Sequence, residues 1–249
     1  DITFSSSDFN DSQKKAIRKV LYSDSISLIQ GPPGTGKTKV IKEIVRQIIS
    51  SVDKVDEMPR ILIVSQSHTA VDNIIEDLIN LNGSRLDIIR IGKKEDVAKK
   101  VYENCAIETI REGMFVQIKK QSDAYIQKKD ALYESVTDVN EKQRWERIKE
   151  IQEDWINRCS GLESLDYQVV KCATIIAGTC IGFLSNDYVK DLDFDYVIID
   201  EAAKATTPEL LVSIIKAKKI VLVGDQNQLP AYANQDLSPI IAELTKKPQ

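Results

Sequence analysis

The stretch Gly-Pro-Pro-Gly-Thr-Gly-Lys-Thr at 31–38 constrains this 249-residue chain more than any other. It fits the pattern G-x-x-x-x-G-K-[ST], in which a glycine-rich loop turns backbone N–H groups inward around a phosphate chain. An apolar run at 26–29 predicts a short buried strand before the loop, and the apolar spacing at 40–48 predicts a helix after it. That helix would direct the positive end of its dipole at the same anion. We therefore expect a site for a nucleoside triphosphate rather than an ordinary glycine-rich turn.

The residues of this loop have distinct expected roles. Lys37 is predicted to reach the β- and γ-phosphates, and the Thr38 hydroxyl is predicted to bind Mg²⁺. Gln13, at the start of a predicted helix, has an amide that donates and accepts at once, as the N6/N7 edge of adenine requires. A glutamine at such a place is otherwise an ordinary solvated side chain. The expected cofactors are ATP and Mg²⁺, and the expected binding residues are Gln13, Gly31, Pro33, Gly34, Thr35, Gly36, Lys37 and Thr38.

Composition narrows the class of protein. With 42% hydrophobic and 29% charged residues, the chain has room for one large α/β domain or one domain with an insertion. Four scattered cysteines and a single histidine make a zinc site unexpected and a reduced, cytoplasmic setting the default. The net charge of −4 argues mildly against tight nucleic-acid binding, yet it leaves room for a local basic groove.

The two ends of the sequence also lead to expectations. No apolar stretch has the length of a membrane span and no signal peptide opens the chain, so no membrane partner is expected. The chain starts at Asp1 without an initiator methionine, and it ends soon after an apolar, helix-like segment. Both features suggest a piece of a longer protein.

Apolar runs alternate with helical patterns along most of the chain. Beyond the P-loop helix, buried strands are predicted at 61–64, 86–91, 194–199 and 220–223, and the apolar stretch 169–177 belongs to the same pattern. Such alternation predicts an α/β fold with a mostly parallel sheet and helices on both faces.

The character of the sequence changes from about Lys93 to Asp166. Glycine nearly vanishes, charges of both signs increase, and apolar residues recur at helical spacing. We predict two long helices folded as an antiparallel hairpin, so that 1–92 and 167–249 form the ATPase domain and 93–166 an inserted helical subdomain. Two roles stay open for the insert, a stalk that packs on itself and a prong for nucleic acid or a partner. Mixed charges by themselves usually indicate only a solvated face.

Two carboxylates, Asp200 and Glu201, follow the apolar run at 194–199. A P-loop ATPase needs a second group on its metal ion and another group that orients or activates water. Asp200 has the type and position for the metal, and Glu201 is the candidate general base. Gln228, just past another predicted strand, could contact both the γ-phosphate and the ordered water. Together with Lys37 these are the predicted catalytic residues, although acidic residues at strand ends also cap helices.

Small hydroxyl side chains and the one histidine follow the strand predicted at 61–64, in Ser-Gln-Ser-His-Thr at 65–69. Parallel α/β sheets bind ligands at the carboxyl ends of their strands. These side chains are therefore placed where a ligand is expected.

Taken in order, these stretches resemble superfamily 1 helicases of the 5′-to-3′ subgroup, in particular the group with the nonsense-mediated-decay, senataxin-like and immunoglobulin-μ-binding helicases. The matching stretches follow the order of the family's motifs and span nearly the whole chain apart from the insert. They are 9–13, 31–38, 65–73, 177–180, 200–203 and 224–230.

This resemblance implies a RecA-like first motor domain of an ATP-dependent DNA or RNA helicase, which couples ATP hydrolysis to movement along single-stranded nucleic acid. Gln13 would then read adenine, and Gln228 would sense the γ-phosphate. The family's strand-contacting positions correspond to Ser65, His68, Thr69 and Thr179. The insert lies where relatives carry a helical subdomain that contacts nucleic acid.

The chain also departs from the family pattern. Lys204 stands where many relatives have glutamine, and Ala231 stands where a second proline is common. Nothing after 224–230 resembles the later motifs, which would bring a second RecA-like domain and its arginine finger. Because loss of such an arginine costs about 10³ to 10⁵ in rate, we expect the chain alone to bind ATP·Mg²⁺, to hydrolyse it poorly and to unwind nothing.

Two rival functions are also compatible with parts of this pattern. A P-loop ATPase of signalling or assembly type would keep Lys37, Asp200 and Glu201 but would not need the stretch 65–69 or the stretch around Thr179. A nucleic-acid or partner-binding module with a decayed ATPase is opposed by the intact phosphate and metal residues. The choice between DNA and RNA depends on contacts to the 2′-OH, which one sequence does not give.

Overall fold

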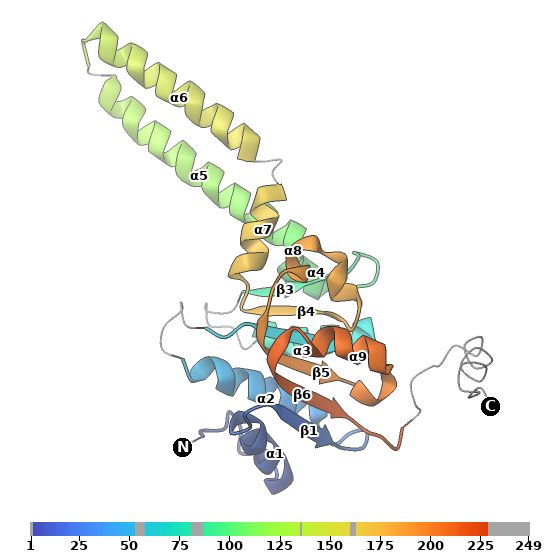
Figure 1. Ribbon diagram of the computed structural model, residues 1–249. Coiled ribbons are helices and arrows are strands. Elements are labelled where there is room, and N and C mark those ends of the chain that lie inside the picture. Colours follow the sequence, from blue (N-terminus) through green and yellow to red (C-terminus); the bar gives the residue numbers. More distant parts are fainter. Residues whose placement is uncertain (1, 53–57, 81–86, 135, 160–162, 229–249) are drawn as a thin grey trace, which may run out of the picture.

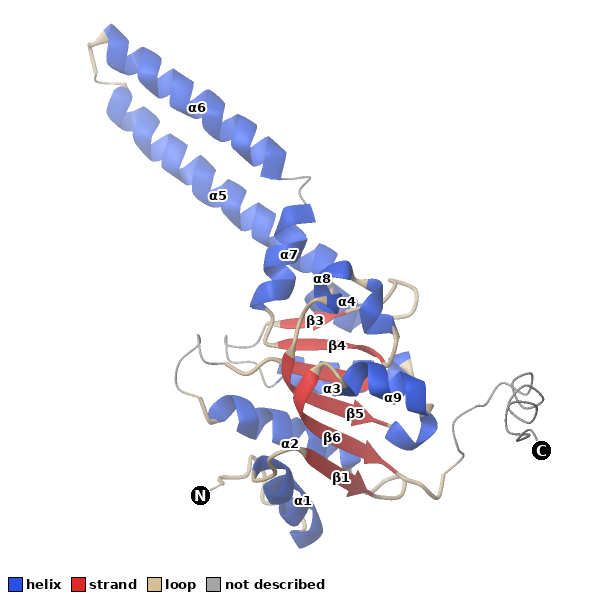
Figure 2. Cartoon of the chain, viewed as in Figure 1, coloured by secondary structure: helices blue, strands red, loops and turns tan. Residues whose placement is uncertain are grey.

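A wholly parallel six-stranded sheet forms the centre of the computed structural model, which describes residues 2–52, 58–80, 87–134, 136–159 and 163–228. The order across the sheet is β1-β6-β5-β2-β4-β3 (Figure 2). The strands are β1 (Ile26–Gln30), β2 (Ile61–Ser65), β3 (Ile88–Arg90), β4 (Ile175–Thr179), β5 (Phe194–Asp200) and β6 (Ala217–Gly224). The predicted α/β fold with a parallel sheet is confirmed.

Helices cover both faces of this sheet (Figure 1). One face carries α1 (Asp11–Leu21), α2 (Lys37–Ser50), α3 (His68–Asn80) and α4 (Lys99–Cys105). The other carries α7 (Glu163–Cys172), α8 (Asp187–Lys190), α9 (Thr207–Ile214) and the 3-10 helices η2 (Gly182–Ser185) and η3 (Ala202–Lys204). Alternate residues of β2 pack into the two layers, and all five are buried. A central strand that is covered on both faces has an unbroken apolar sequence, as residues 61–64 do.

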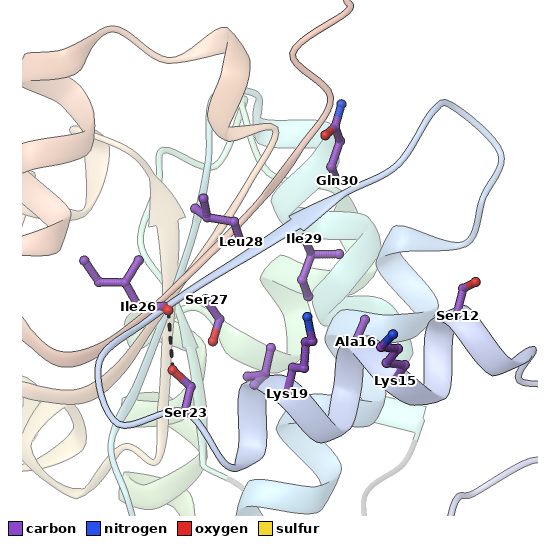
Figure 3. A pocket seen from close by; sticks show the side chains of 11 residues that line it. Ser12, Lys15, Ala16, Lys19, Ser23, Ile26, Ser27, Leu28, Ile29 and Gln30 are labelled. Atoms are coloured by element: carbon purple, nitrogen blue, oxygen red, sulfur yellow. Dashed lines mark hydrogen bonds between the residues drawn. The ribbon is translucent and has the colours of Figure 1, made fainter.

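The edge strand β1 is covered on one face only. Ser27 and Ile29 point toward α1, whereas Ile26 and Leu28 point away from it (Figure 3). The two outward side chains are 58% and 75% exposed. Since β1 leads directly into the P-loop, its packing on α1 holds the start of the loop against the sheet.

The apolar stretch 169–177 divides between two elements. Its first residues complete α7, where Val169 and Val170 are buried, and β4 begins only at Ile175. A short apolar run does not distinguish a strand from a buried helical turn. The strand predicted at 86–91 is shorter in the structure, where β3 spans Ile88–Arg90 and excludes Asp87 and Ile91, while Leu86 lies outside the described residues.

The predicted helical hairpin is confirmed as α5 (Ile107–Tyr133) and α6 (Val139–Cys159), which project from the sheet side by side (Figure 1). Trp145 of α6 packs against the last turns of α5, near the turn of the hairpin, and is only 4% exposed. Its ring stacks on Tyr133 of α5 with centroids 5.3 Å apart. Its indole Nε1 donates a hydrogen bond of 2.6 Å to Asp130 Oδ1. One buried indole thus joins the two helices by packing and by a hydrogen bond.

The base of the hairpin is tied to the sheet domain. Arg111 of α5 forms an ion pair of 2.9 Å with Asp166 of α7. Ile107 is buried in the core beneath one face of the sheet, and Val101 of α4 is buried beneath the other. Within the described residues, no helix is both long and apolar enough to cross a membrane.

We predict that Trp145→Ala loosens the hairpin without unfolding the sheet. Truncating a buried tryptophan costs about 3–5 kcal/mol, through lost packing and the cavity left behind. Hydrogen exchange should show lost protection of backbone amides in α5 and α6, with those of β2 and β5 unchanged.

The matched control is Trp155→Ala on the same helix, because Trp155 is 54% exposed. It should leave exchange throughout the hairpin close to that of the unaltered chain. Equal effects of the two substitutions would contradict the assigned role of Trp145.

Candidate active site

The predicted site residues gather at the carboxyl ends of the parallel strands. The loop after β1, the turn after β6 and the carboxylates at the end of β5 are neighbours because these strands are adjacent in the sheet. The Gly31 N–H donates to the Gly224 carbonyl over 3.1 Å, which ties the start of the P-loop to the end of β6. A side chain at Gly224 would press on the backbone of η3, since a Cβ there would lie 3.1 Å from Ala203 N.

The P-loop curls around the ammonium group of its own lysine. Lys37 Nζ donates to the carbonyl oxygens of Gly31 at 2.7 Å and Pro32 at 3.1 Å. Gly34 and Gly36 have φ of 78° and 80°, in the left-handed region that glycine adopts at little cost. The loop thus places a cation inside its curve, where a phosphate chain would need it.

Gln13 links α1 to the P-loop. Its Nε2 donates to the Thr35 carbonyl over 2.9 Å, and its Oε1 accepts from the Asn10 backbone N–H over 3.1 Å. The second bond belongs to a capping box at the start of α1. Both ends of the amide are therefore engaged within the protein, and the reading of adenine by Gln13 stays a prediction.

Asp200 is a buried carboxylate at the end of β5, with 6% exposure. The pKa of Asp200 is raised, chiefly by burial and further by the negative charge of Glu201. The hydrogen bond from the Glu201 N–H and the charges of Lys37 and Lys204 oppose this rise without cancelling it. The Glu201 N–H donates to Asp200 Oδ1 over 2.9 Å. Loss of water around this carboxylate makes its ionised form costly, so a cation placed beside it would be strongly favoured.

The donor types fit Mg²⁺. A phosphate-bound Mg²⁺ takes hard oxygen ligands, of which the protein usually supplies one or two carboxylates or hydroxyls. Thr38, in the first turn of α2, and Asp200 offer such oxygens. Across the described ranges, no group of three or more His, Cys, Asp or Glu side chains is placed to hold a metal.

Glu201 has an unusual backbone. Its φ of 53° lies in the left-handed region, and no other described residue except glycine has a positive φ. Such a conformation costs a non-glycine residue about 1–2 kcal/mol. Its carboxylate is held from two sides, because Oε1 forms an ion pair with Lys204 and Oε2 accepts from Ser67 Oγ over 3.3 Å. The predicted general base is thus in contact with the stretch 65–69.

Ser65 lies beside Asp200 and Thr179 in the register of the sheet. Its side chain is fully buried, and its hydroxyl has no hydrogen-bond partner among the described residues. This burial does not fit the predicted contact between Ser65 and a nucleic-acid backbone.

His68 is fixed by a buried ion pair. Arg90 Nε contacts Asp72 Oδ1 at 2.7 Å with both side chains buried, and Arg90 Nη2 lies 3.2 Å from His68 Nδ1. A guanidinium only donates hydrogen bonds, so His68 Nδ1 must accept and the ring proton sits on Nε2. The half-buried His68 therefore offers an N–H donor on the ring edge away from Arg90.

The other predicted residues occupy neighbouring turns. Thr69 is exposed at the start of α3, and Thr179 Oγ1 accepts from the Gly182 N–H over 3.0 Å. Gln228 Nε2 donates to Asp225 Oδ2 over 3.3 Å, in the turn after β6. Asp225 is 7% exposed and also accepts from a backbone N–H of this turn.

Several residues that contact the site are not among the predicted catalytic, cofactor-binding or strand-contacting residues. They are Ser67, Asp72, Arg90, Lys204 and Asp225. Lys204 could have been singled out from the sequence, because it departs from the pattern of the family that the chain resembles. The spacing Asn10-x-x-Gln13 was a signal for the capping box. The pairing of Arg90 with Asp72 joins a strand to a helix, and nothing in local spacing reports it.

Comparison with known proteins gives one family and several relatives. A family described as an AAA domain (AAA_11) matches residues 8–234. The chain is 27% identical, over 99% of its length, to an uncharacterized ATP-dependent helicase of Methanocaldococcus jannaschii, of which it covers 42%. It is 30% identical over 91% of its length to the DNA replication ATP-dependent helicase/nuclease DNA2 of Saccharomyces cerevisiae, covering 11% of that protein. It is 28% identical over 88% of its length to Regulator of nonsense transcripts 1 of Dictyostelium discoideum, covering 15%. The chain thus spans less than half the length of each relative.

Two buried aspartates should respond in opposite ways to loss of charge. Asp72→Asn leaves the buried Arg90 guanidinium without its counter-ion, which should lower the free energy of unfolding by about 3 kcal/mol or more. Asp200→Asn removes a desolvated charge and keeps an oxygen for the Glu201 N–H, so the free energy of unfolding should stay constant or rise. Urea denaturation at pH 7 without nucleotide measures both, and equal losses would contradict the assignment.

Proposed function

The chain belongs to the AAA-domain family AAA_11 and is a superfamily 1 helicase motor domain, and we propose that it is the first, ATP-binding motor domain of a helicase that moves along single-stranded DNA or RNA. The observation that carries this proposal is the Lys37 ammonium inside the P-loop, two strands away from the buried carboxylate of Asp200. A phosphate cradle and a metal-binding acid thus share one edge of the sheet.

In this proposal Lys37 exchanges the carbonyl oxygens of Gly31 and Pro32 for phosphate oxygens. Thr38 and Asp200 would hold Mg²⁺, which when bound neutralises charge on the phosphates. Glu201 would accept a proton from the attacking water, and Gln228 would sense the γ-phosphate from the turn ordered by Asp225.

The strand would run along the ends of β2 and β4. His68 offers an N–H donor there, and Thr69 and Thr179 lie at the neighbouring turns. Ser65 would support this edge from beneath rather than touch the strand. The helical insert 93–166 would divide the ATPase domain into 1–92 and 167–249, with α4 of the insert packed on the sheet and α5 and α6 projecting away from the sheet.

The relatives are much longer than this chain, and we propose that a second RecA-like domain completes the motor. ATP would draw the two domains together, and the second would supply the arginine that stabilises the transferring phosphoryl group. The chain alone should then bind ATP·Mg²⁺ and hydrolyse it slowly. Since the relatives are named as helicases, a signalling or assembly ATPase is not favoured.

The nucleotide site is tested by Lys37→Met in this chain. Loss of a charge-assisted contact of about 1.5–3 kcal/mol should weaken ATP binding by about 10- to 100-fold in calorimetry with Mg²⁺. Lys39→Met is the matched control on the same helix, because the Lys39 ammonium lies over the Phe9 ring, 4.5 Å from its centroid. Equal affinities of the two variants would place the nucleotide elsewhere.

The motor function is tested by ATP hydrolysis in the full-length protein, with and without single-stranded DNA or RNA, at two salt concentrations. One kind of strand should raise turnover, and the effect should weaken as salt rises, because phosphate contacts release counter-ions. Steady turnover that neither strand changes would support a signalling or assembly ATPase instead.

A further inference from the structure

The carboxylate of Glu201 is engaged on both oxygens by residues of different elements. Lys204, at the end of η3, forms an ion pair with Oε1. Ser67, just before α3, donates a hydrogen bond of 3.3 Å from its hydroxyl to Oε2. The Glu201 and Lys204 side chains are 26% and 40% exposed, so the cluster lies at the surface of the site.

Ser67 connects this carboxylate to α3. Its Oγ accepts from the Ala70 N–H over 3.3 Å, the bond by which a serine caps a helix. The same hydroxyl thus holds the first turn of α3 and, through its proton, Glu201. His68 and Thr69, which we propose to meet the strand, follow Ser67 directly in the chain.

A general base needs an oxygen lone pair directed at the water it deprotonates. In the arrangement seen here, each oxygen has one contact, with Lys204 or with Ser67, and these two contacts fix the direction in which the carboxylate faces. The left-handed backbone at Glu201 and the Glu201 N–H bond to Asp200 fix the root of this side chain, so its carboxylate turns only about the side-chain bonds.

We propose that Ser67 and Lys204 form a latch that holds Glu201 in a resting orientation until a strand binds at the first turn of α3. This inference rests on the proposed function and adds a regulatory device to it. A phosphate oxygen of the strand at His68 and Thr69 accepts the hydrogen bond of the Ser67 hydroxyl in place of Glu201 Oε2. The remaining ion pair with Lys204 is partly exposed and screened by water, so it opens readily. Glu201 then turns toward the water beside the nucleotide.

Lys204 gives this latch its particular chemistry. A glutamine at this position would offer Glu201 a neutral N–H rather than a full charge. A charged donor holds a carboxylate more strongly than a neutral one. Hydrolysis without a strand is therefore held lower by Lys204 than it would be by glutamine.

The test compares Lys204→Met with Lys204→Arg in the full-length protein. Lys204→Met should raise the strand-free kcat by about fivefold, the population shift expected from losing one weak contact. The stimulation by a strand should fall by the same factor, with the KM for ATP unchanged. Lys204→Arg keeps the cation and should keep both wild-type rates. Ser67→Ala should act like Lys204→Met, and Ser67→Thr, which keeps a hydroxyl, should restore the wild-type behaviour.

Controls separate the latch from other effects. The double variant Lys204→Met, Glu201→Gln should be as slow as Glu201→Gln alone, and a raised rate in it would show an effect that bypasses Glu201 and overturn the latch. Thermal unfolding checks Ser67→Ala for a lost helix cap, whereas Lys204→Met leaves α3 untouched.

The remaining outcomes tell the two proposals apart. If the wild type responds to a strand but Lys204→Met leaves the strand-free rate unchanged or lowers it, the latch is overturned and the motor function stands. If the wild type hydrolyses ATP without responding to any strand, the proposed function fails and the latch fails with it.

Discussion

The parallel register of β1, β6, β5, β2 and β4 is the constraint on which the rest of the site depends. It brings the carboxyl ends of five strands to one edge, and the bond from the Gly31 N–H to the Gly224 carbonyl locks the P-loop to that edge. Parallel strands need helical crossovers, which bury the sheet on both faces and leave the loops at its ends free to carry polar groups. The phosphate loop, the acids and the strand-facing residues are therefore neighbours by topology, although they lie far apart in the sequence.

Charge burial then assigns different tasks to similar residues. Asp72 is paired with Arg90 beneath the sheet edge, and this pair fixes the ring of His68. Asp200 is buried with a raised pKa and has Lys37 and Lys204 only as more distant charges. The pair of Asp72 and Arg90 stabilises the fold and orients the N–H donor of His68. The carboxylate of Asp200 is costly to ionise without water around it, and a bound metal ion would offset that cost.

The sequence predicted the elements with strong local signals. The P-loop, the strand that ends at Asp200 and the helical hairpin follow from spacing alone, because each is recorded in a contiguous stretch. Contacts that join distant elements left no such trace. Three features depend on the register between strands and on how loops pack. They are the burial of Ser65, the ion pair of Arg90 with Asp72 and the hydrogen bond from Ser67 to Glu201. The sequence also did not predict that the stretch 169–177 divides into the end of α7 and the start of β4, because an apolar run of that length fits either a helix or a strand.

The measurement that tests this account most directly is a structure of the chain with a non-hydrolysable ATP analogue and Mg²⁺. We predict that Lys37 Nζ leaves the carbonyl oxygens of Gly31 and Pro32 for phosphate oxygens, while Thr38 and Asp200 face the metal ion. An analogue bound away from 31–38, or a Lys37 that stays on those carbonyls with the phosphates in place, would contradict it.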